Sequence, residues 1–277
     1  MDMKIYGFYA NIGMLGQKEV FRRLFCGLSR ERQQKTERIR NGKEKERSLL
    51  AGALLDFGLW RLYGLRERDV AISYGAQGKP YLRDYPDIQF NLSHSGDYAL
   101  AVFAPAAVGC DIQQKGQAKK QERIAARFFA EEERRAMEDG ADFDYIWARK
   151  ESFLKLTGAG MSFDMRAFCV TGESCVVYGK DLPDEACAVC GKAPADMRCL
   201  ADGTDTVRQK RRDACTGLPG GCADVSAGFY RFADFRLPGY CLSACYANAE
   251  PLPAVWAETT EEALPEMDSK EPDARGK

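Results

Sequence analysis

The stretch from Trp147 to Gly160 holds the side chains best suited to chemistry, and it reads Trp-Ala-Arg-Lys-Glu-Ser-Phe-Leu-Lys-Leu-Thr-Gly-Ala-Gly. On a helix, where successive residues turn by about 100°, Glu151 and Lys155 are neighbours. Lys150 falls within an apolar stripe of that helix, so its ammonium must either reach water or meet a fixed anion. The stripe consists of Phe143, Ile146, Trp147, Phe153 and Leu154. The pattern fits a core helix with a surface ion pair, and it also fits an anion and metal site, which needs a second carboxylate.

Asp111 is the candidate for that second carboxylate. It lies in the apolar segment Gly109-Cys110-Asp111-Ile112-Gln113. Buried strands seldom contain an acid without a partner, so Asp111 is a candidate site residue. Gln113, two residues on, points to the same side of the strand. Carboxylate oxygens are ligands that a hard divalent ion prefers.

Other residues could hold an anion. His94, the only histidine, lies in the hydroxyl-rich turn Ser93-His94-Ser95-Gly96, which suits contact with a phosphate, although a lone histidine is more often structural. Lys79 follows a turn with two glycines. Arg32, Lys35 and Arg47 lie in basic helical segments, where a run of charge is usually a solvated face.

These residues must be positioned by a mixture of strands and helices. The first part of the chain predicts a strand over 5–10, a basic helical segment over about 17–41, a helix over about 43–63, and strands over 70–74, 88–92, 98–104 and 107–113. Further on, the pattern predicts a helix opening at 128–133, the central helix after 140, a strand pair within 163–178 turning at 172–173, a hairpin over 229–247, and an edge strand over 251–256.

Composition restricts the class of protein. The chain has 277 residues, 45% hydrophobic and 29% charged, which is typical of a soluble globular protein with one large domain or two lobes. A net charge of −1 gives no general attraction to nucleic acid. No stretch approaches the roughly 18 apolar residues of a membrane span, and the N-terminus has no signal-peptide pattern, so a cytoplasmic protein is expected.

Residues 180–227 differ in composition from the rest of the chain, being rich in Asp, Gly, Pro and Cys. Cys187-x-x-Cys190 and the later cysteines invite a zinc interpretation, but neither a second such pair nor a histidine supports it. A flexible insertion is favoured instead. Residues 259–277 are acidic and are expected to form a disordered tail.

The order of these motifs closely resembles the surfactin-synthetase-activating (Sfp-like) type of 4′-phosphopantetheinyl transferase. The motifs are Gly-Lys-Pro, Asn-Leu-Ser-His-Ser, Gly-Cys-Asp-Ile-Gln and Trp-x-x-Lys-Glu-Ser-Phe-x-Lys. The resemblance covers about residues 20–256 and implies an α+β fold of two similar α/β lobes with the active site in the cleft between them. The lobes would be 1–105 and 106–258, with 180–227 as the insertion.

The resemblance also implies roles for single residues. Asp111 and Glu151 match magnesium ligands, and Gln113 stands where many relatives carry an acid, so its part in metal binding is open. Arg32, Lys35, Arg47 and His94 match positions that hold the 3′-phosphate of coenzyme A, Lys79 and Ser93 match further coenzyme-binding positions, and Lys150 and Lys155 match lysines near the pyrophosphate. Asp111, Glu151 and Lys155 are the expected catalytic residues, with Glu151 the candidate to draw a proton.

The implied reaction is the Mg²⁺-dependent transfer of 4′-phosphopantetheine from coenzyme A to a serine of an acyl or peptidyl carrier protein, which releases adenosine 3′,5′-bisphosphate. The carrier would belong to fatty-acid, polyketide or nonribosomal peptide synthesis, and the enzyme would act as a monomer. A first alternative is a non-catalytic carrier-protein or coenzyme A binding module weakened in metal binding by Gln113. A second, a nucleic-acid binder, is disfavoured because no aromatic stacking stripe accompanies the basic residues.

Overall fold

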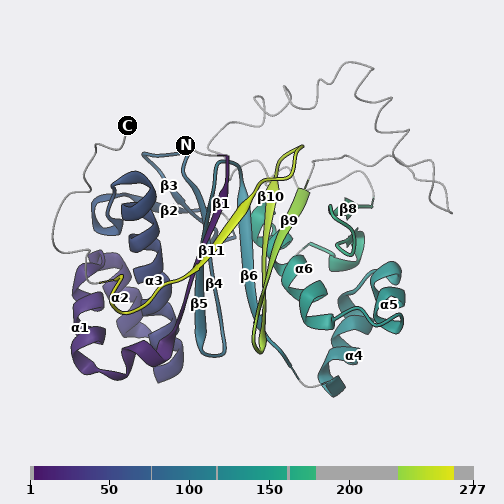
Figure 1. Ribbon diagram of the computed structural model, residues 1–277, viewed down its shortest axis with the longest axis horizontal. Helices are drawn as coiled ribbons and strands as arrows, with labels where there is room; N and C mark the ends of the chain where they lie inside the picture. Colours follow the sequence, from purple (N-terminus) through teal and green to yellow (C-terminus); the bar gives the residue numbers. More distant parts are fainter. Residues whose placement is uncertain (1–2, 76, 117, 161–162, 179–229, 265–277) are drawn as a thin grey trace, which may run out of the picture.

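Two sheets stacked face to face form the centre of the molecule, with helices on the outer side of each (Figure 1). The structure is a computed structural model that describes residues 3–75, 77–116, 118–160, 163–178 and 230–264. The fold is therefore mixed α+β, as the sequence predicts.

The four-stranded sheet has the order β11-β1-β5-β4. Its strands are β1 (Ile5–Asn11), β4 (Gln89–Ser95), β5 (Tyr98–Ala104) and β11 (Ala254–Glu258), and β11 alone pairs in parallel, with β1. Its outer side packs against α1 (Lys18–Gly27) and α3 (Gly42–Tyr63), with α2 (Arg30–Arg38) lying against α3. The short strands β2 (Ile72–Tyr74) and β3 (Pro80–Leu82) form a separate hairpin before β4.

The three-stranded sheet has the order β6-β10-β9. Its strands are β6 (Val108–Gln114), β9 (Tyr230–Leu237) and β10 (Tyr240–Ala247), all antiparallel. On its outer side lie α4 (Ala118–Phe128), α5 (Glu131–Glu138) and α6 (Phe143–Thr157), together with the short pair β7 (Phe168–Cys169) and β8 (Val176–Val177). The remaining elements are the 3-10 turns η1 (Ile12–Gly16), η2 (Glu67–Asp69) and η4 (Met165–Ala167).

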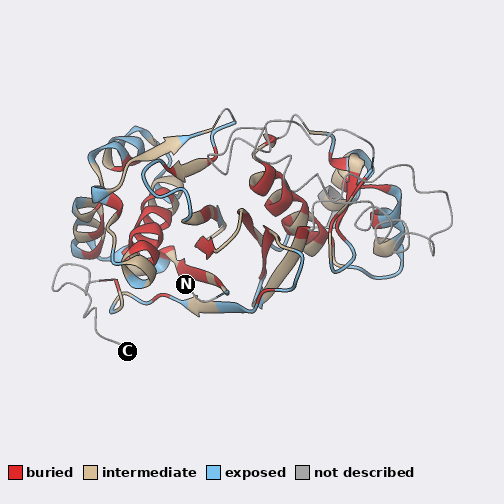
Figure 2. Ribbon diagram, turned by 90° about the horizontal axis from the view of Figure 1, so that it is seen from above, coloured by how far each residue is buried: buried red, intermediate tan, exposed pale blue. Residues whose placement is uncertain are grey.

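Alternation along β5 shows how the layers stack. Ala99, Ala101 and Phe103 face the core under the first helices, whereas Leu100 and Val102 face a second core between the two sheets. Successive side chains of a strand point to opposite faces, so a strand buried on both faces reads as continuously apolar. Figure 2 shows the resulting buried interior, to which nearly all of β5, most of α6 and the inward half of α3 belong.

Helix α6 lies directly on β6 because Gly109 has no side chain. A Cβ built there would collide with the backbone of Ser152 and Leu156. The glycine of the Gly-x-Asp motif therefore lets the helix backbone approach the strand, a recognised use of glycine in strands. This contact fixes the position of α6 relative to Asp111, two residues along β6.

Several boundaries differ from those predicted. The basic segment 17–41 forms two helices, because Ser29 begins α2 as an N-cap whose hydroxyl accepts a hydrogen bond from Arg32 N. Helix α4 was not predicted, and α5 begins only at Glu131. The predicted edge strand near the C-terminus is present as β11, but it belongs to the four-stranded sheet together with β1.

Residues 259–264, the first part of the expected tail, pack against the fold. Thr259 N donates to Tyr9 O at 2.8 Å, and Leu264 is 1% exposed in the core under α3. Residues 265–277 and the predicted insertion 180–227, including Cys187 and Cys190, lie outside the described residues. The six cysteines that the structure describes are free thiols.

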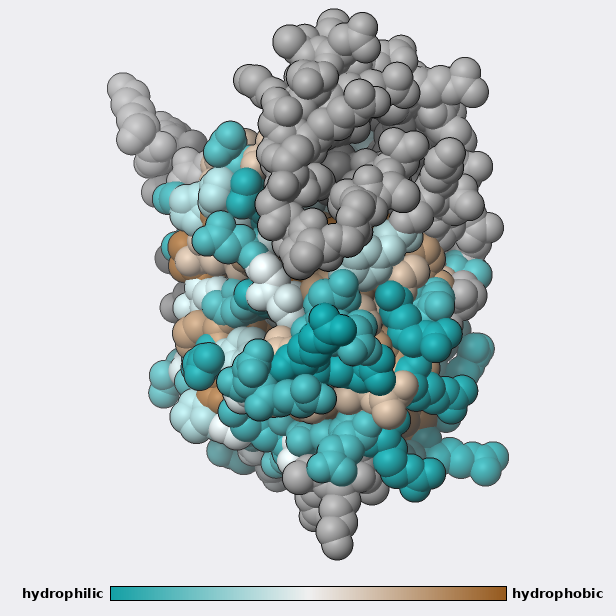
Figure 3. Space-filling model, turned by 90° about the vertical axis from the view of Figure 1, so that its right-hand side faces the viewer, coloured by the Kyte–Doolittle hydropathy of each residue, from teal (hydrophilic) through white to brown (hydrophobic). Residues whose placement is uncertain are grey.

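The outer face around α4 and α5 is mainly hydrophilic (Figure 3), as expected for two helices rich in Lys, Arg and Glu. Among the helices in the described part of the chain, none combines the length and apolar character needed to cross a membrane.

Candidate active site

Side chains rather than a backbone ladder join the edges of the two sheets where β4 meets β6. Alternate residues of β4 accept hydrogen bonds from alternate amides of β6. The pairs are Asn91 Oδ1 with Cys110 N at 3.0 Å, Ser93 Oγ with Ile112 N at 3.3 Å, and Ser95 Oγ with Gln114 N at 3.0 Å. This arrangement satisfies buried amides and leaves polar side chains at the junction, which we call the β4–β6 seam.

Asp111 lies at the centre of the β4–β6 seam and is 6% exposed. Its Oδ1 accepts hydrogen bonds from Ser93 Oγ at 2.8 Å and from Lys155 Nζ at 2.6 Å, and the same Nζ lies 2.8 Å from Ser93 Oγ. Burial opposes the charge of Lys155, but the nearby Asp111 carboxylate outweighs it and raises the lysine pKa. The buried acid of β6 thus has its partner on α6, 44 residues away in the sequence.

Glu151 is the second carboxylate of the site. Burial, and then the negative charge of Asp111, raise the pKa of Glu151 above its ordinary value, while Lys155 lowers it. The two carboxylates are therefore close enough to repel each other, with one lysine shared between them. Acids whose pKa is shifted by burial and by a neighbouring charge mark a candidate functional site.

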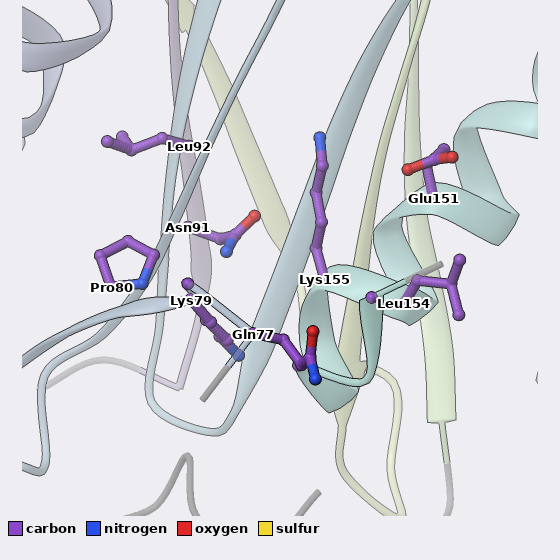
Figure 4. Close-up of a pocket in the computed structure, with 11 residues that line it drawn as sticks. Gln77, Lys79, Pro80, Asn91, Leu92, Glu151, Leu154 and Lys155 are labelled. Carbon is purple, nitrogen blue, oxygen red and sulfur yellow. The ribbon is translucent and has the colours of Figure 1, made fainter. Parts of the chain in front are cut away.

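A cavity of about 240 Å³ opens beside these residues. It is lined by Gln77, Gly78, Lys79, Pro80, Asn91, Leu92, Glu151, Leu154, Lys155, Gly158 and Gly160. Figure 4 shows Lys155 projecting from α6 between Asn91 of β4 and Glu151 of its own helix. The cavity lies between the β2–β3 turn, the β4–β6 seam and the C-terminal half of α6.

Lys79 crosses from the β2–β3 turn to the other sheet. Its Nζ donates to Val108 O at 2.9 Å and to Leu156 O at 2.8 Å, and the residue is 8% exposed. Burial lowers the pKa of Lys79 to about 7. Lys79 lines the cavity, and its ammonium joins β6 to α6.

Lys150 points away from the cavity. It is fully buried, and its Nζ donates to Glu133, to Met165 O and to Phe168 O at 2.7–2.8 Å. Three acceptors match the three N–H groups of an ammonium, while burial lowers the pKa of Lys150 and raises that of Glu133. Lys150 therefore meets a fixed anion inside the core, and the structure does not bring it to the other lysines of the site.

Arg47 and His94 lie together at the start of α3 and the end of β4. The Arg47 guanidinium donates to Gly96 O at 2.8 Å, and both Arg47 and His94 contact the carboxylate of Glu44. Burial lowers the pKa of His94, and Glu44 partly offsets this. Gly96 has a positive φ of 56°, and a Cβ there would meet Gln114 Oε1 at 2.6 Å, so only glycine allows this turn.

Arg32 and Lys35 lie near each other on α2, and no hydrogen bond or ion pair among the described residues joins them to Arg47. Arg32 is 6% exposed with its Nε 3.8 Å from Glu67 Oε1, and Lys35 Nζ lies 5.8 Å from the centre of the Tyr74 ring. Burial, and then the charge of Arg32, lower the pKa of Lys35. The four predicted phosphate ligands thus form two pairs.

Comparisons with known proteins identify the family. A model described as "4′-phosphopantetheinyl transferase, N-terminal" matches residues 16–106, and the model of the 4′-phosphopantetheinyl transferase superfamily matches residues 107–187. The chain is 31% identical over 188 residues to 4′-phosphopantetheinyl transferase Sfp of Bacillus subtilis (strain 168), covering 66% of this chain and 82% of that protein. This chain belongs to the 4′-phosphopantetheinyl transferase superfamily, in its Sfp-like type.

Two further relatives agree with the assignment of this chain to the family. 4′-Phosphopantetheinyl transferase psf-1 of Bacillus pumilus is 32% identical over 61% of this chain and 80% of its own length. L-aminoadipate-semialdehyde dehydrogenase-phosphopantetheinyl transferase of Xenopus laevis is 37% identical over 32% of this chain and 36% of its own.

Sequence reasoning missed Asn91, which lines the cavity, and the acids that pair with two of the predicted site residues. Asn91 could have been found, because its spacing from Ser93 and Ser95 places all three on one face of a strand. Glu44 and Glu133 gave no local signal, since each is an ordinary acid on an amphipathic helix whose partner is decided by packing.

Proposed function

We propose that this protein transfers 4′-phosphopantetheine from coenzyme A to a serine of an acyl or peptidyl carrier protein and releases adenosine 3′,5′-bisphosphate. The observation that carries the proposal is the meeting of Asp111, Glu151 and Lys155 beside the cavity at the β4–β6 seam. These are the residues that the family resemblance assigns to the reaction, and they come from two separate elements.

The two sheets with their helices are proposed to be the two lobes, about 1–105 and 106–258, with β11 returning to the first. Coenzyme A would bind between the lobes along the β4–β6 seam. The cavity of about 240 Å³ would take only part of it, so the remainder would lie along the surface towards Arg47 and His94. Residues 180–227 are proposed to be an insertion within the second lobe.

Asp111 and Glu151 fit a magnesium ion. Among the described residues, no group of three or more His, Cys, Asp or Glu side chains is placed to hold a metal. Magnesium, however, is commonly bound by one or two carboxylates together with substrate phosphates and water. The two acids already repel each other, and the Lys155 ammonium lies against Asp111 in the position of a cation. The Nε2 group of Gln113 donates to Gln114 O at 2.9 Å, so the amide oxygen is the atom of Gln113 that could be added as a ligand.

When bound, the ion would neutralise charge that develops on the pyrophosphate. The serine oxygen of the carrier forms a bond to the phosphorus next to pantetheine, and the bond from that phosphorus to the bridging oxygen breaks. Glu151 would take the serine proton, directly or through a water, because its carboxylate lines the cavity beside Lys155. Lys155 would leave Asp111 and stabilise charge on the phosphate oxygens.

Arg47 of α3 and His94 of β4 are proposed to hold the 3′-phosphate. Arg32 and Lys35 of α2 are proposed to assist them. Ser93 would act through Asp111 and Lys155, which it contacts directly. For Lys150 a coenzyme contact is not retained, because all three of its N–H groups have partners in the core.

Mass spectrometry of an apo carrier protein incubated with coenzyme A, Mg²⁺ and the transferase tests the proposal. The expected result is a mass increase of one phosphopantetheine group, abolished by Asp111→Ala. Bound coenzyme with no mass increase on any carrier tested would contradict it and indicate a non-catalytic binding module. Omission of Mg²⁺ tests the metal requirement separately.

A further inference from the structure

The carboxylate of Glu44 lies between Arg47 and His94. Its Oε2 accepts hydrogen bonds from Arg47 Nε at 3.1 Å and Nη2 at 2.5 Å, and its Oε1 lies 3.4 Å from His94 Nε2. An anion belonging to the protein therefore already contacts the two side chains that the proposed function assigns to the 3′-phosphate of the coenzyme.

The orientation of Arg47 makes the Glu44 carboxylate and a bound phosphate compete for the same N–H groups. Its Nη1 donates to Gly96 O at 2.8 Å, which fixes the guanidinium and directs the edge carrying Nε and Nη2 towards Glu44. Arginine commonly binds a phosphate through two parallel N–H groups, and this edge presents such a pair. A phosphate that uses the edge must displace the Glu44 carboxylate.

Displacement is feasible because the group is near the surface. The side chains of Arg47, Glu44 and His94 are 20%, 37% and 36% exposed. Glu44 and Arg47 are three residues apart on one helix, and such partly exposed pairs contribute little stability. A dianionic phosphate carries more charge than the carboxylate and can replace it.

We propose that Glu44 is an internal competitor for the 3′-phosphate subsite and lowers the affinity of the protein for 3′-phosphorylated adenosine nucleotides. The inference rests on the proposed function. Substrate and bisphosphate product carry the same 3′-phosphate, so tight binding of that group would hold both equally and would not raise turnover. A displaceable carboxylate weakens both and favours release of the product, a step that often limits turnover.

Calorimetric titration of Glu44→Gln with adenosine 3′,5′-bisphosphate, coenzyme A and dephospho-coenzyme A tests the inference. Glutamine keeps the size of the side chain and removes its charge. The bisphosphate and coenzyme A should bind about two- to fivefold more tightly than to the wild type, from the usual strength of such an ion pair. Dephospho-coenzyme A, which lacks the 3′-phosphate, should bind with unchanged affinity.

Two controls isolate the contact. Glu46→Gln removes the same charge from the same helix about 200° away and should leave the preference between the coenzymes unchanged. In an Arg47→Ala background, Glu44→Gln should tighten coenzyme A less than it does in the wild type, because of the two contested side chains only His94 remains.

The outcomes separate this inference from the proposed function. Weaker coenzyme A binding by Glu44→Gln would overturn the inference and show that Glu44 positions Arg47 for the phosphate. Equal tightening of dephospho-coenzyme A would also overturn it, as a general charge effect. Wild-type protein that binds none of the three nucleotides would overturn the proposed function itself.

Discussion

At the scale of single residues, the two carboxylates of the site differ in how well their charges are compensated. Asp111 is held by Lys155 and Ser93, whereas Glu151 is partly buried near Asp111 and, within the described part of the chain, has no equally close cation. Uncompensated charge in a fold is typical of a functional site, where stability is given up for activity. The difference leads to opposite expectations for the two acids.

Glu151→Gln is expected to stabilise the metal-free protein at pH 7.5 by about 0.5–2 kcal/mol while abolishing most turnover. The pKa of Glu151 is higher in the folded than in the unfolded protein, whose ordinary value is near 4.5. Above pH 4.5 the folded state therefore keeps a proton that the unfolded state loses. The free energy of unfolding falls as pH rises from there to the pKa of the folded protein. Urea unfolding at pH 4 and 7.5 measures the effect, which should vanish at pH 4.

Asp111→Asn is the matched comparison, because it changes the same charge at the well-paired acid and should destabilise the protein at pH 7.5. A Glu151→Gln variant less stable than the wild type at pH 7.5 would show that Lys155 compensates Glu151 fully.

Lys150 is a core residue, and its replacement should act mainly on stability. Lys150→Met leaves the fully buried Glu133 carboxylate without its cation, which typically costs about 3–5 kcal/mol. The double variant Lys150→Met/Glu133→Gln removes both charges and should recover much of that loss. Urea unfolding of the three proteins measures both changes. If Lys150→Met were as stable as the wild type but lacked activity, Lys150 would be a coenzyme ligand after all.

At the scale of elements, the site depends on the close approach of α6 to β6. Gly109 permits this approach, and the side chains of β4 complete the seam by bonding the amides of β6. The Asp111–Lys155 contact is therefore a consequence of strand–helix packing, and it should respond to a small displacement of the helix.

Gly109→Ala should destabilise the protein by about 1–3 kcal/mol, as overpacked cores usually do, and should also lower turnover. The added methyl must push away the backbone of Ser152 and Leu156, and Leu156 follows Lys155 directly. Denaturant unfolding and the carrier mass assay measure the two effects. Gly27→Ala is the control, since a Cβ there meets no atom within 4 Å. Wild-type stability and activity of Gly109→Ala would mean that α6 can move away freely.

At the scale of the whole molecule, two sheets are held together by an apolar core between them, by the polar β4–β6 seam and by Lys79. Lys79 joins the β2–β3 turn to both β6 and α6, so the charge it carries affects the assembly of the cavity from both sides. A buried lysine of this kind makes stability depend on pH.

Lys79 should contribute stability that increases from pH 7 to about 10. Its pKa is about 7 in the folded protein and 10.5 ordinarily, so between these values the unfolded state binds the extra proton. Stability rises with pH wherever the unfolded state binds more protons. The free energy of unfolding of the wild type minus that of Lys79→Met, both from urea unfolding, should therefore rise over this range. Lys18→Met, at an exposed position of α1, should leave the pH profile unchanged. A constant difference for Lys79→Met would contradict the depressed pKa.

The sequence alone determined the features that depend on local geometry. Helical periodicity placed Lys150 in an apolar stripe, and strand alternation placed Asp111 in a buried strand with Gln113 on the same side, because backbone geometry sets both repeats. Motif order was enough for the family, since the spacing of Gly-x-Asp and Trp-x-x-Lys-Glu-Ser-x-x-Lys is specific. The mixed α+β class followed from the same patterns.

Only the tertiary structure decided which opposite charge each residue meets. The sequence paired Lys155 with Glu151, its helical neighbour, but Lys155 Nζ bonds to Asp111 from another element. Lys150 meets Glu133, and Arg47 meets Glu44 together with the turn at Gly96. Ionic attraction acts through space and depends on how strands and helices pack, and the periodicity of one segment carries no information about that packing.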